Sequence, residues 1–159
     1  MVTIQSHSGI YTLEVRQFIK CPMDEAWQFF SSPGNLSKIT PVHMGFQITS
    51  GTPARMHPGQ IITYRVSPFP GITTNWVTEI THVEEGKFFV DEQRFGPYRM
   101  WHHEHYFEAQ GEGVLMTDRV SYKLPFGFIG RLAQTLFIKR QLREIFSFRE
   151  EFLNKMFTQ

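Results

Sequence analysis

The sequence predicts an α+β domain in which an antiparallel sheet is covered by a long C-terminal helix. Between residues 46 and 124, short strand-like segments alternate with spacers rich in Gly, Pro or charge, and short spacers join antiparallel neighbours. From residue 129 onward, apolar residues recur at three- and four-residue spacing, which is the period of an amphipathic helix. At 159 residues the chain is long enough for one sizeable core and too short for two ordinary domains, so we expect a single domain over residues 1–159.

A strand and two short helices are predicted at the beginning of the chain. Residues 11–19 alternate apolar and polar side chains and predict a first strand after a short polar tail. Pro22 suits the first position of a helix, and the acidic residues after it suit the positive end of the helix dipole, so a helix is predicted at about 22–31. A second helical turn is predicted at 35–39, before Pro41.

Six more strands complete a predicted sheet of seven. They are expected near residues 46–50, 60–67, 74–83, 87–93, 98–107 and 114–124. The C-terminal helix is predicted to lay one apolar stripe on this sheet. The stripe consists of Ile129, Leu132, Ala133, Leu136, Leu142, Ile145, Phe152 and Met156.

Composition excludes several classes of partner. The formal net charge is +1, from 16 basic and 15 acidic residues, so nothing favours a nucleic acid or an anionic membrane. No apolar run approaches the roughly 20 residues of a membrane-spanning helix, and the N-terminus lacks the features of a signal peptide. We therefore expect a cytoplasmic protein, monomer or homodimer, with no membrane insertion. The aromatic content of 15% favours a large apolar cavity or an unusually aromatic core.

The chain has one cysteine, Cys21, so neither an internal disulfide nor a cysteine-based zinc ribbon can form. Cys21 precedes a predicted helix N-terminus, a position that lowers the pKa of a thiol. Because no base is identifiable nearby, we interpret it as a residue at the helix cap and not as a nucleophile.

The segment YRMWHHEHYF, residues 98–107, carries the most distinctive pattern. Successive side chains of a strand point to opposite faces. One face therefore carries Trp101, His103, His105 and Phe107. A face that mixes aromatic rings with two histidines fits a pocket, where an apolar wall needs a few polar anchors.

A turn at about 109–113 sets the expected register of this strand against the next one. If Phe107 lies opposite Val114, then His103 lies opposite Asp118, and the same face gains Val120 and Tyr122. We predict that this face lines a cavity. On the strand at 74–83, the face carrying Trp76, Thr78 and Ile80 is predicted to point inward, whereas for the strand at 87–93 either Asp91 and Gln93 or Val90 and Glu92 lie inward.

The expected His103–Asp118 pair has three interpretations. It is a structural pair that satisfies two half-buried polar groups, an anchor for a ligand, or an acid–base pair in which the carboxylate orients the imidazole. His103 and His105 also have the spacing to chelate one metal, with Asp118 as a third ligand, but the motif is weak. The simpler interpretation is that the two histidines are polar residues of the cavity wall. We expect neither a bound metal nor a cofactor.

Three segments carry a family resemblance: FIKCPMDEAWQFFSSPGNLSKITP, FFVDEQRFGPYRMWHHEHYFE and LMTDRVSYKLPFGFIG. They resemble the START-like and pollen-allergen-like superfamily, often labelled SRPBCC, and the resemblance extends over about residues 11–157. They look like the bacterial ligand-binding SRPBCC branch, near the polyketide cyclase/dehydrase group. The resemblance implies a helix-grip fold, in which a curved antiparallel sheet wraps around the terminal helix and encloses a cavity for a small apolar molecule.

One departure from the superfamily limits what can be transferred. The plant-allergen relatives carry a glycine-rich loop after the second strand, whereas this chain reads SGTPARMHPGQ there, so no phosphate cradle is expected. The catalytic residues of the cyclases differ between members, and no motif carries them to this sequence.

Binding of a small hydrophobic or aromatic ligand is the leading hypothesis. The residues expected to hold the ligand are Trp76, Trp101, His103, His105, Asp118, Tyr122 and Leu136. The alternative is a cyclase/dehydrase-type enzyme acting on a carbonyl-bearing polyketide-like substrate, with His103 as general base and Asp118 as its partner. A third possibility is an interaction module that docks a partner through Phe69, Phe95 and Tyr106.

Overall fold

The computed structural model describes residues 2–51, 55–69 and 71–157. Its strands form one antiparallel sheet in the order β1-β2-β8-β7-β6-β5-β4-β3. The strand bounds are β1 Thr3–His7, β2 Ile10–Ile19, β3 Gln47–Ile48, β4 Gln60–Phe69, β5 Ile72–Glu84, β6 Phe88–Phe95, β7 Met100–Gln110 and β8 Gly113–Lys123. The helices are α1 Met23–Phe30, the 3₁₀ turns η1 Pro33–Ser37 and η2 Val42–Met44, α2 Gly127–Ala133, the π-helical segment η3 Gln134–Ile138 and α3 Lys139–Phe157.

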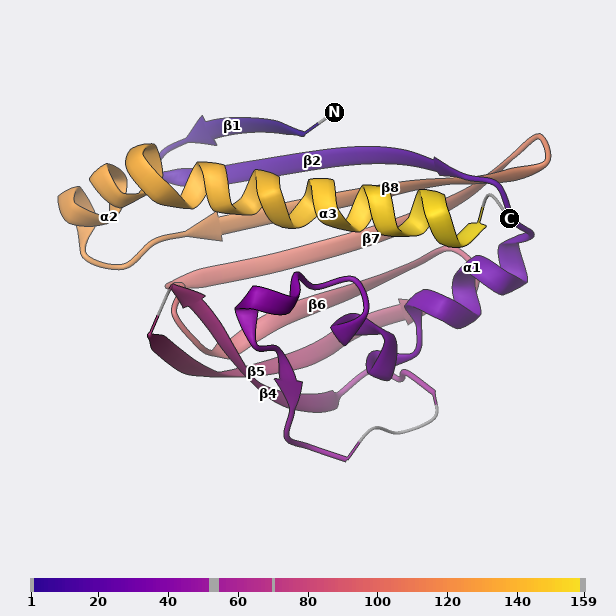
Figure 1. Ribbon diagram of the computed structural model, residues 1–159, viewed down its shortest axis with the longest axis horizontal. Coiled ribbons are helices and arrows are strands. Elements are labelled where there is room, and N and C mark those ends of the chain that lie inside the picture. The colour runs from indigo at the N-terminus through magenta and orange to yellow at the C-terminus, as the bar shows by residue number, and fades with distance from the viewer. Residues whose placement is uncertain (1, 52–54, 70, 158–159) are drawn as a thin grey trace.

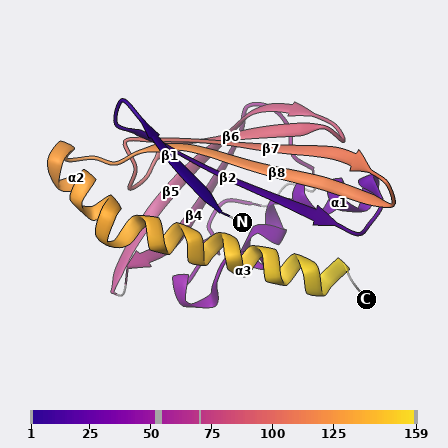
Figure 2. The ribbon, with the colours of Figure 1, turned by 90° about the horizontal axis from the view of Figure 1, so that it is seen from above.

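The sheet curves around α3, which runs along β2 and β8, while α1 closes one end of the sheet (Figure 1, Figure 2). The α+β class and the antiparallel sheet gripping a long terminal helix are confirmed. The predicted helix at 22–31 and the helical turn at 35–39 correspond to α1 and η1. None of the helices in the described part of the chain combines the length and the apolar character needed to cross a bilayer.

The prediction of seven strands is wrong, because β1 adds an eighth. This strand pairs with β2 through a two-residue turn in which Ser8 and Gly9 both have positive φ, 50° and 77°. Such turns match the twist of a hairpin. Four of its five side chains are exposed, and only Ile4 is partly buried. An edge strand with solvent on both faces has no apolar alternation, so its sequence resembles a polar tail.

The register of β7 against β8 differs from the prediction by two residues. The connecting turn is shorter than expected, since Gln110 already pairs with Gly113, and His105 therefore lies opposite Asp118 while His103 lies opposite Val120. A shift of two residues keeps every side chain on its predicted face, because the side-chain period of a strand is two.

The predicted apolar stripe of the C-terminal helix is wrong in its first part and partly right in α3, where Leu142 is buried and Ile145 and Phe152 pack against the core. Its members Ile129, Leu132 and Leu136 are exposed, and α2 extends past the ends of the strands (Figure 2). The buried residues of the C-terminal helical region recur mostly every four positions. They are Gly130, Gln134, Ile138, Leu142, Phe146, Arg149, Leu153 and Phe157. The π-helical segment and the absence of sheet beneath α2 explain why a regular 3.6-residue period fails here.

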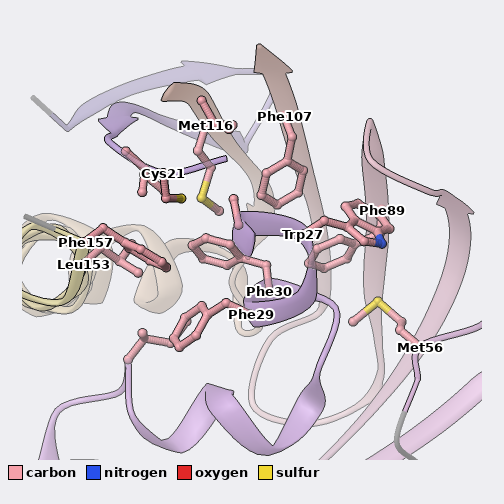
Figure 3. Packing of buried hydrophobic residues seen from close by; sticks show 14 of the residues in the cluster. Cys21, Trp27, Phe29, Phe30, Met56, Phe89, Phe107, Met116, Leu153 and Phe157 are labelled. Atoms are coloured by element: carbon pink, nitrogen blue, oxygen red, sulfur yellow. The ribbon is translucent and has the colours of Figure 1, made fainter. Parts of the chain in front are cut away.

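The main core lies where α1 fills the space between the sheet and the end of α3 (Figure 3). Trp27 on α1 meets Phe107 on β7 edge to face, with ring centroids 5.5 Å apart. Phe29 meets Phe157 of α3 in the same manner at 5.8 Å. This aromatic cluster closes one end of the interior, and the space beside it remains open as a cavity.

Candidate functional site

A cavity of about 180 Å³ lies between the sheet and α3. Its wall is mostly apolar and includes Trp76, Trp101, Tyr64, Ile80, Val66 and Phe146. Polar side chains gather on one part of the wall, where Asp91, His103, His105 and Arg149 meet. An apolar chamber with a few convergent polar groups has the composition of a small-molecule site.

Aromatic rings hold one side of this chamber in place. Trp76 on β5 stacks on Tyr64 of β4 with centroids 5.8 Å apart, and it meets Trp101 of β7 edge to face at 5.4 Å. These rings stand on adjacent or nearly adjacent strands, so the pleat of the sheet fixes their spacing. The indole Nε1 of Trp76 is buried and has no hydrogen-bond partner among the described residues.

Two histidines and two aspartates form a closed cluster on the polar part of the wall. His103 Nε2 donates to Asp118 Oδ1 at 3.0 Å, and His103 Nδ1 lies 3.5 Å from Asp91 Oδ2. His105 Nε2 donates to the same Asp91 oxygen at 2.9 Å, and His105 Nδ1 lies 2.8 Å from Asp118 Oδ1. This last contact has the geometry of a close ion pair and not of a well-directed hydrogen bond. Each imidazole therefore lies between both carboxylates.

Arg149 of α3 adds a positive charge beside this cluster. Its Nη1 lies 3.7 Å from Asp118 Oδ1, and its guanidinium stands over the Phe146 ring at 4.9 Å. Only 7% of the residue is exposed, yet Nε and Nη1 have no hydrogen-bond partner among the described residues. Buried guanidinium donors without an acceptor are costly. Arg149 is one of the residues that line the cavity.

The charges of the cluster are coupled. Burial would raise the pKa of Asp118, but the contacts from His103 and His105 and the charge of Arg149 hold it below its usual value. Burial likewise opposes ionisation of Asp91, and the two histidines nevertheless lower its pKa. Burial also favours neutral imidazoles, yet contacts with both aspartates raise the pKa of His105. For His103, burial and the neighbouring His105 prevail and lower the pKa.

The structure brings together most of the residues singled out from the sequence. Trp76, Trp101, His103 and His105 line the cavity, and the expected His103–Asp118 contact is present although the two residues sit diagonally across the strands. Asp118 lies behind the histidines and does not reach the wall.

Tyr122 and Leu136 do not line the cavity. Tyr122 is fully buried and its hydroxyl accepts a hydrogen bond from Gln134 at 2.7 Å. Leu136 is 56% exposed, because Gln134 and Ile138 form the buried face of this segment. Phe95 and Tyr106, named as docking aromatics, are exposed, and the side chain of Phe69 lies outside what the structure describes.

Two residues of the site were not identified from the sequence. Asp91 remained one of two open alternatives, because Phe88 and Phe89 fit either face of their strand. The predicted helix stripe does not include Arg149. Its signal is its place between Phe146 and Leu153 on the four-residue stripe of α3, where a charged residue interrupts a buried face.

Comparisons with known proteins give structural relatives only. No protein-family model matches the chain, and no curated protein matches it by sequence. A structure from Thermus thermophilus is similar with a TM-score of 0.67 and 14% identity, covering 91% of this chain and 98% of that one. A Mycobacterium smegmatis structure gives 0.67 and 16%, covering 98% and 99%.

A plant structure extends the same likeness. The ginseng major latex-like protein 151 from Panax ginseng gives a TM-score of 0.69 and 14% identity, covering 96% of this chain and 100% of that one. At these identities the likeness concerns the fold. The chain shares the fold of these structures, and its eight-stranded sheet around a long terminal helix is the helix-grip arrangement expected from the sequence resemblance.

Proposed function

We propose that the protein binds one small aromatic or otherwise apolar molecule that carries a hydrogen-bond acceptor, in the cavity between the sheet and α3. The observation that carries the proposal is an apolar chamber whose wall includes Trp76 and Arg149, two residues with buried donors that have no acceptor among the described residues. A ligand oxygen that reached these donors would satisfy groups that otherwise remain unpaired. The apolar wall would supply the remaining affinity by removing the ligand's surface from water.

The size of the cavity limits the ligand. An apolar cavity of about 150 Å³ in another protein accommodates benzene, so about 180 Å³ corresponds to a single ring with a short substituent. Drug-sized ligands occupy roughly 300–1,000 Å³. We therefore expect the ligand to be a single-ring acid or ketone and not a sterol, a long fatty acid or a multi-ring polyketide.

The test is a binding screen with matched compounds and a matched variant. Native mass spectrometry of gently purified protein detects a retained ligand, and calorimetry with benzoate, phenylacetate, acetophenone and toluene measures affinity. We expect the acceptor-bearing compounds to bind more tightly than toluene. Val66→Phe places an aromatic ring into the chamber from a buried wall position. This variant should stay folded and lose ligand binding. Absence of binding to wild type for the whole set would overturn the proposal.

An acid–base enzyme near the polyketide cyclase/dehydrase group remains the second candidate. It is favoured by the buried His103–Asp118 hydrogen bond at the cavity wall. One contact disfavours the enzyme: the other ring nitrogen of His103, Nδ1, lies 3.5 Å from Asp91. A general base needs a nitrogen that is open to the substrate. His103→Gln separates the candidates. It should remove turnover of any identified substrate if His103 is the general base, and it should leave turnover intact if His103 is only part of the cavity wall.

A further inference from the structure

We propose that Asp91, His103 and His105 form a binding site for one divalent transition-metal ion, with Asp118 as the carboxylate that orients both histidines. This inference goes beyond ligand binding and revises the expectation, stated from the sequence, that no metal is bound. The three residues each offer one ligand atom, and these atoms all lie within 4.8 Å of one another. They sit on the adjacent strands β6 and β7, which hold their positions rigidly.

The interatomic distances suit a shared ion. Two ligands that are each about 2.0–2.1 Å from a metal are roughly 2.9 Å apart at a right angle and roughly 3.3 Å apart at the tetrahedral angle. Asp91 Oδ2 lies 2.9 Å from His105 Nε2 and 3.5 Å from His103 Nδ1. An ion bound between these three atoms would replace the direct contacts among them with little movement of the chain.

The residue behind the histidines has the position of an orienting carboxylate. Metal-binding histidines almost always direct the other ring N–H to a carboxylate, a backbone carbonyl or water. Asp118 Oδ1 lies 3.0 Å from His103 Nε2 and 2.8 Å from His105 Nδ1, on the ring nitrogens that the ion would leave free. One buried carboxylate thus serves both rings. The sequence had suggested Asp118 as a third ligand, whereas the geometry assigns that role to Asp91.

The position of the set relative to the cavity also fits a metal that meets a ligand. Asp91 and both histidines line the cavity, and Asp118 does not. Three protein ligands on one side would leave the remaining coordination positions facing the chamber, which is the arrangement of metal sites that bind a water or a substrate. Two imidazoles and one carboxylate suit zinc and ferrous iron better than calcium or magnesium, which prefer oxygen ligands.

The charges of the site are compatible with a dication. Each histidine lies between the same two carboxylates, so two acidic groups stand next to the position of the ion. Histidine ligands bind a metal in the neutral form, and the carboxylates would then offset the charge of the dication. Arg149 also lines the cavity, and its positive charge lies closest to Asp118, whose Oδ1 is 3.7 Å from Nη1.

The test uses the full-length protein without a polyhistidine tag, stripped with a chelator. Cobalt(II) is titrated in and followed by its visible absorption, and zinc(II) is then used to displace it. We expect one equivalent to saturate the wild type. Asp91→Asn and His105→Gln should lose the saturable signal, and Asp118→Asn should weaken binding roughly 10- to 100-fold. His102→Gln is the matched control, because His102 lies on the same strand and pairs with Glu92 away from the cavity.

A second measurement needs no variant, in case the substitutions disturb folding. Anomalous diffraction at the zinc edge from wild-type crystals grown with zinc should give a peak between Asp91 and the two histidines. The proposal is overturned if stripped wild type binds neither ion, if Asp91→Asn and His105→Gln bind as wild type does, or if the anomalous peaks lie only on the surface.

Discussion

Replacement of Arg149 by methionine tests whether this buried cation serves ligand binding or the fold. Methionine keeps the unbranched apolar stem and a comparable helix propensity, and it removes the guanidinium. Two groups, Nε and Nη1, then no longer lie buried without partners. Each such group costs about 1–3 kcal/mol, so the substitution removes an unfavourable contribution from the folded state.

Two favourable contacts are lost at the same time. The guanidinium stands over Phe146 at 4.9 Å, which is worth about 0.5–2 kcal/mol, and Nη1 lies 3.7 Å from Asp118, beyond hydrogen-bond distance. Asp118 keeps its hydrogen bond from His103. The gains offset the losses, and we expect the free energy of unfolding of Arg149→Met to lie within about 1 kcal/mol of wild type or above it.

The assay is urea unfolding followed by circular dichroism, with ligand affinity measured in parallel. Arg140→Met is the matched control, an exposed arginine on the same helix, and its unfolding free energy should stay within about 0.5 kcal/mol of wild type. Affinity for a single-ring carboxylate should fall roughly 10- to 150-fold in Arg149→Met, which corresponds to a charge-assisted hydrogen bond of about 1.5–3 kcal/mol. A loss of stability of about 3 kcal/mol or more would show that Arg149 is the structural counter-ion of Asp118, and the reasoning would fail.

Three further outcomes follow from packing and burial. Phe107→Ala should cost about 3–5 kcal/mol in urea unfolding, because its ring packs in the main core, whereas Phe95→Ala on the exposed end of β6 should change stability by at most about 0.5 kcal/mol; equal costs would contradict the assigned core. Val66→Phe should leave the thermal midpoint at or above that of wild type, because the added ring fills existing space, and a large drop would mean that the chamber is already packed. Burial raises the pKa of the Cys21 thiol, so less thiolate is present at pH 8, and reaction with a disulfide reagent should be about tenfold or more slower in the native protein than in urea; equal rates would contradict its burial.

Periodicity explains which parts of the fold were predictable. The inward faces of the strands at 74–83 and 98–107 were predicted because apolar and aromatic residues alternate there, and a two-residue error in register preserves the face. The contact between His103 and Asp118 was found for this reason, although the two residues are not directly opposite. Strand β1 was missed because its exposed faces carry no alternation.

The remaining errors come from features that depend on the assembled structure. The helix stripe changes phase where the chain adopts a π-helical turn and leaves the sheet, and no local pattern marks either event. Asp91 could not be assigned a face, because adjacent phenylalanines make both faces of its strand apolar. Arg149 interrupts an apolar stripe, and its role depends on facing Asp118 across the interior. The candidate site therefore combines residues found by alternation with residues that only the tertiary arrangement identifies.

The central claim is that the chamber between the sheet and α3 binds a single-ring ligand, and titration followed by the indole resonances of the three tryptophans tests it most directly. Trp76 and Trp101 line the cavity, whereas Trp27 lies in the main core. Benzoate or acetophenone should shift the Trp76 and Trp101 resonances saturably, leave Trp27 nearly unchanged, and have no saturable effect in Val66→Phe. Absence of saturable shifts across the single-ring compounds, or equal shifts in Val66→Phe, would contradict the account.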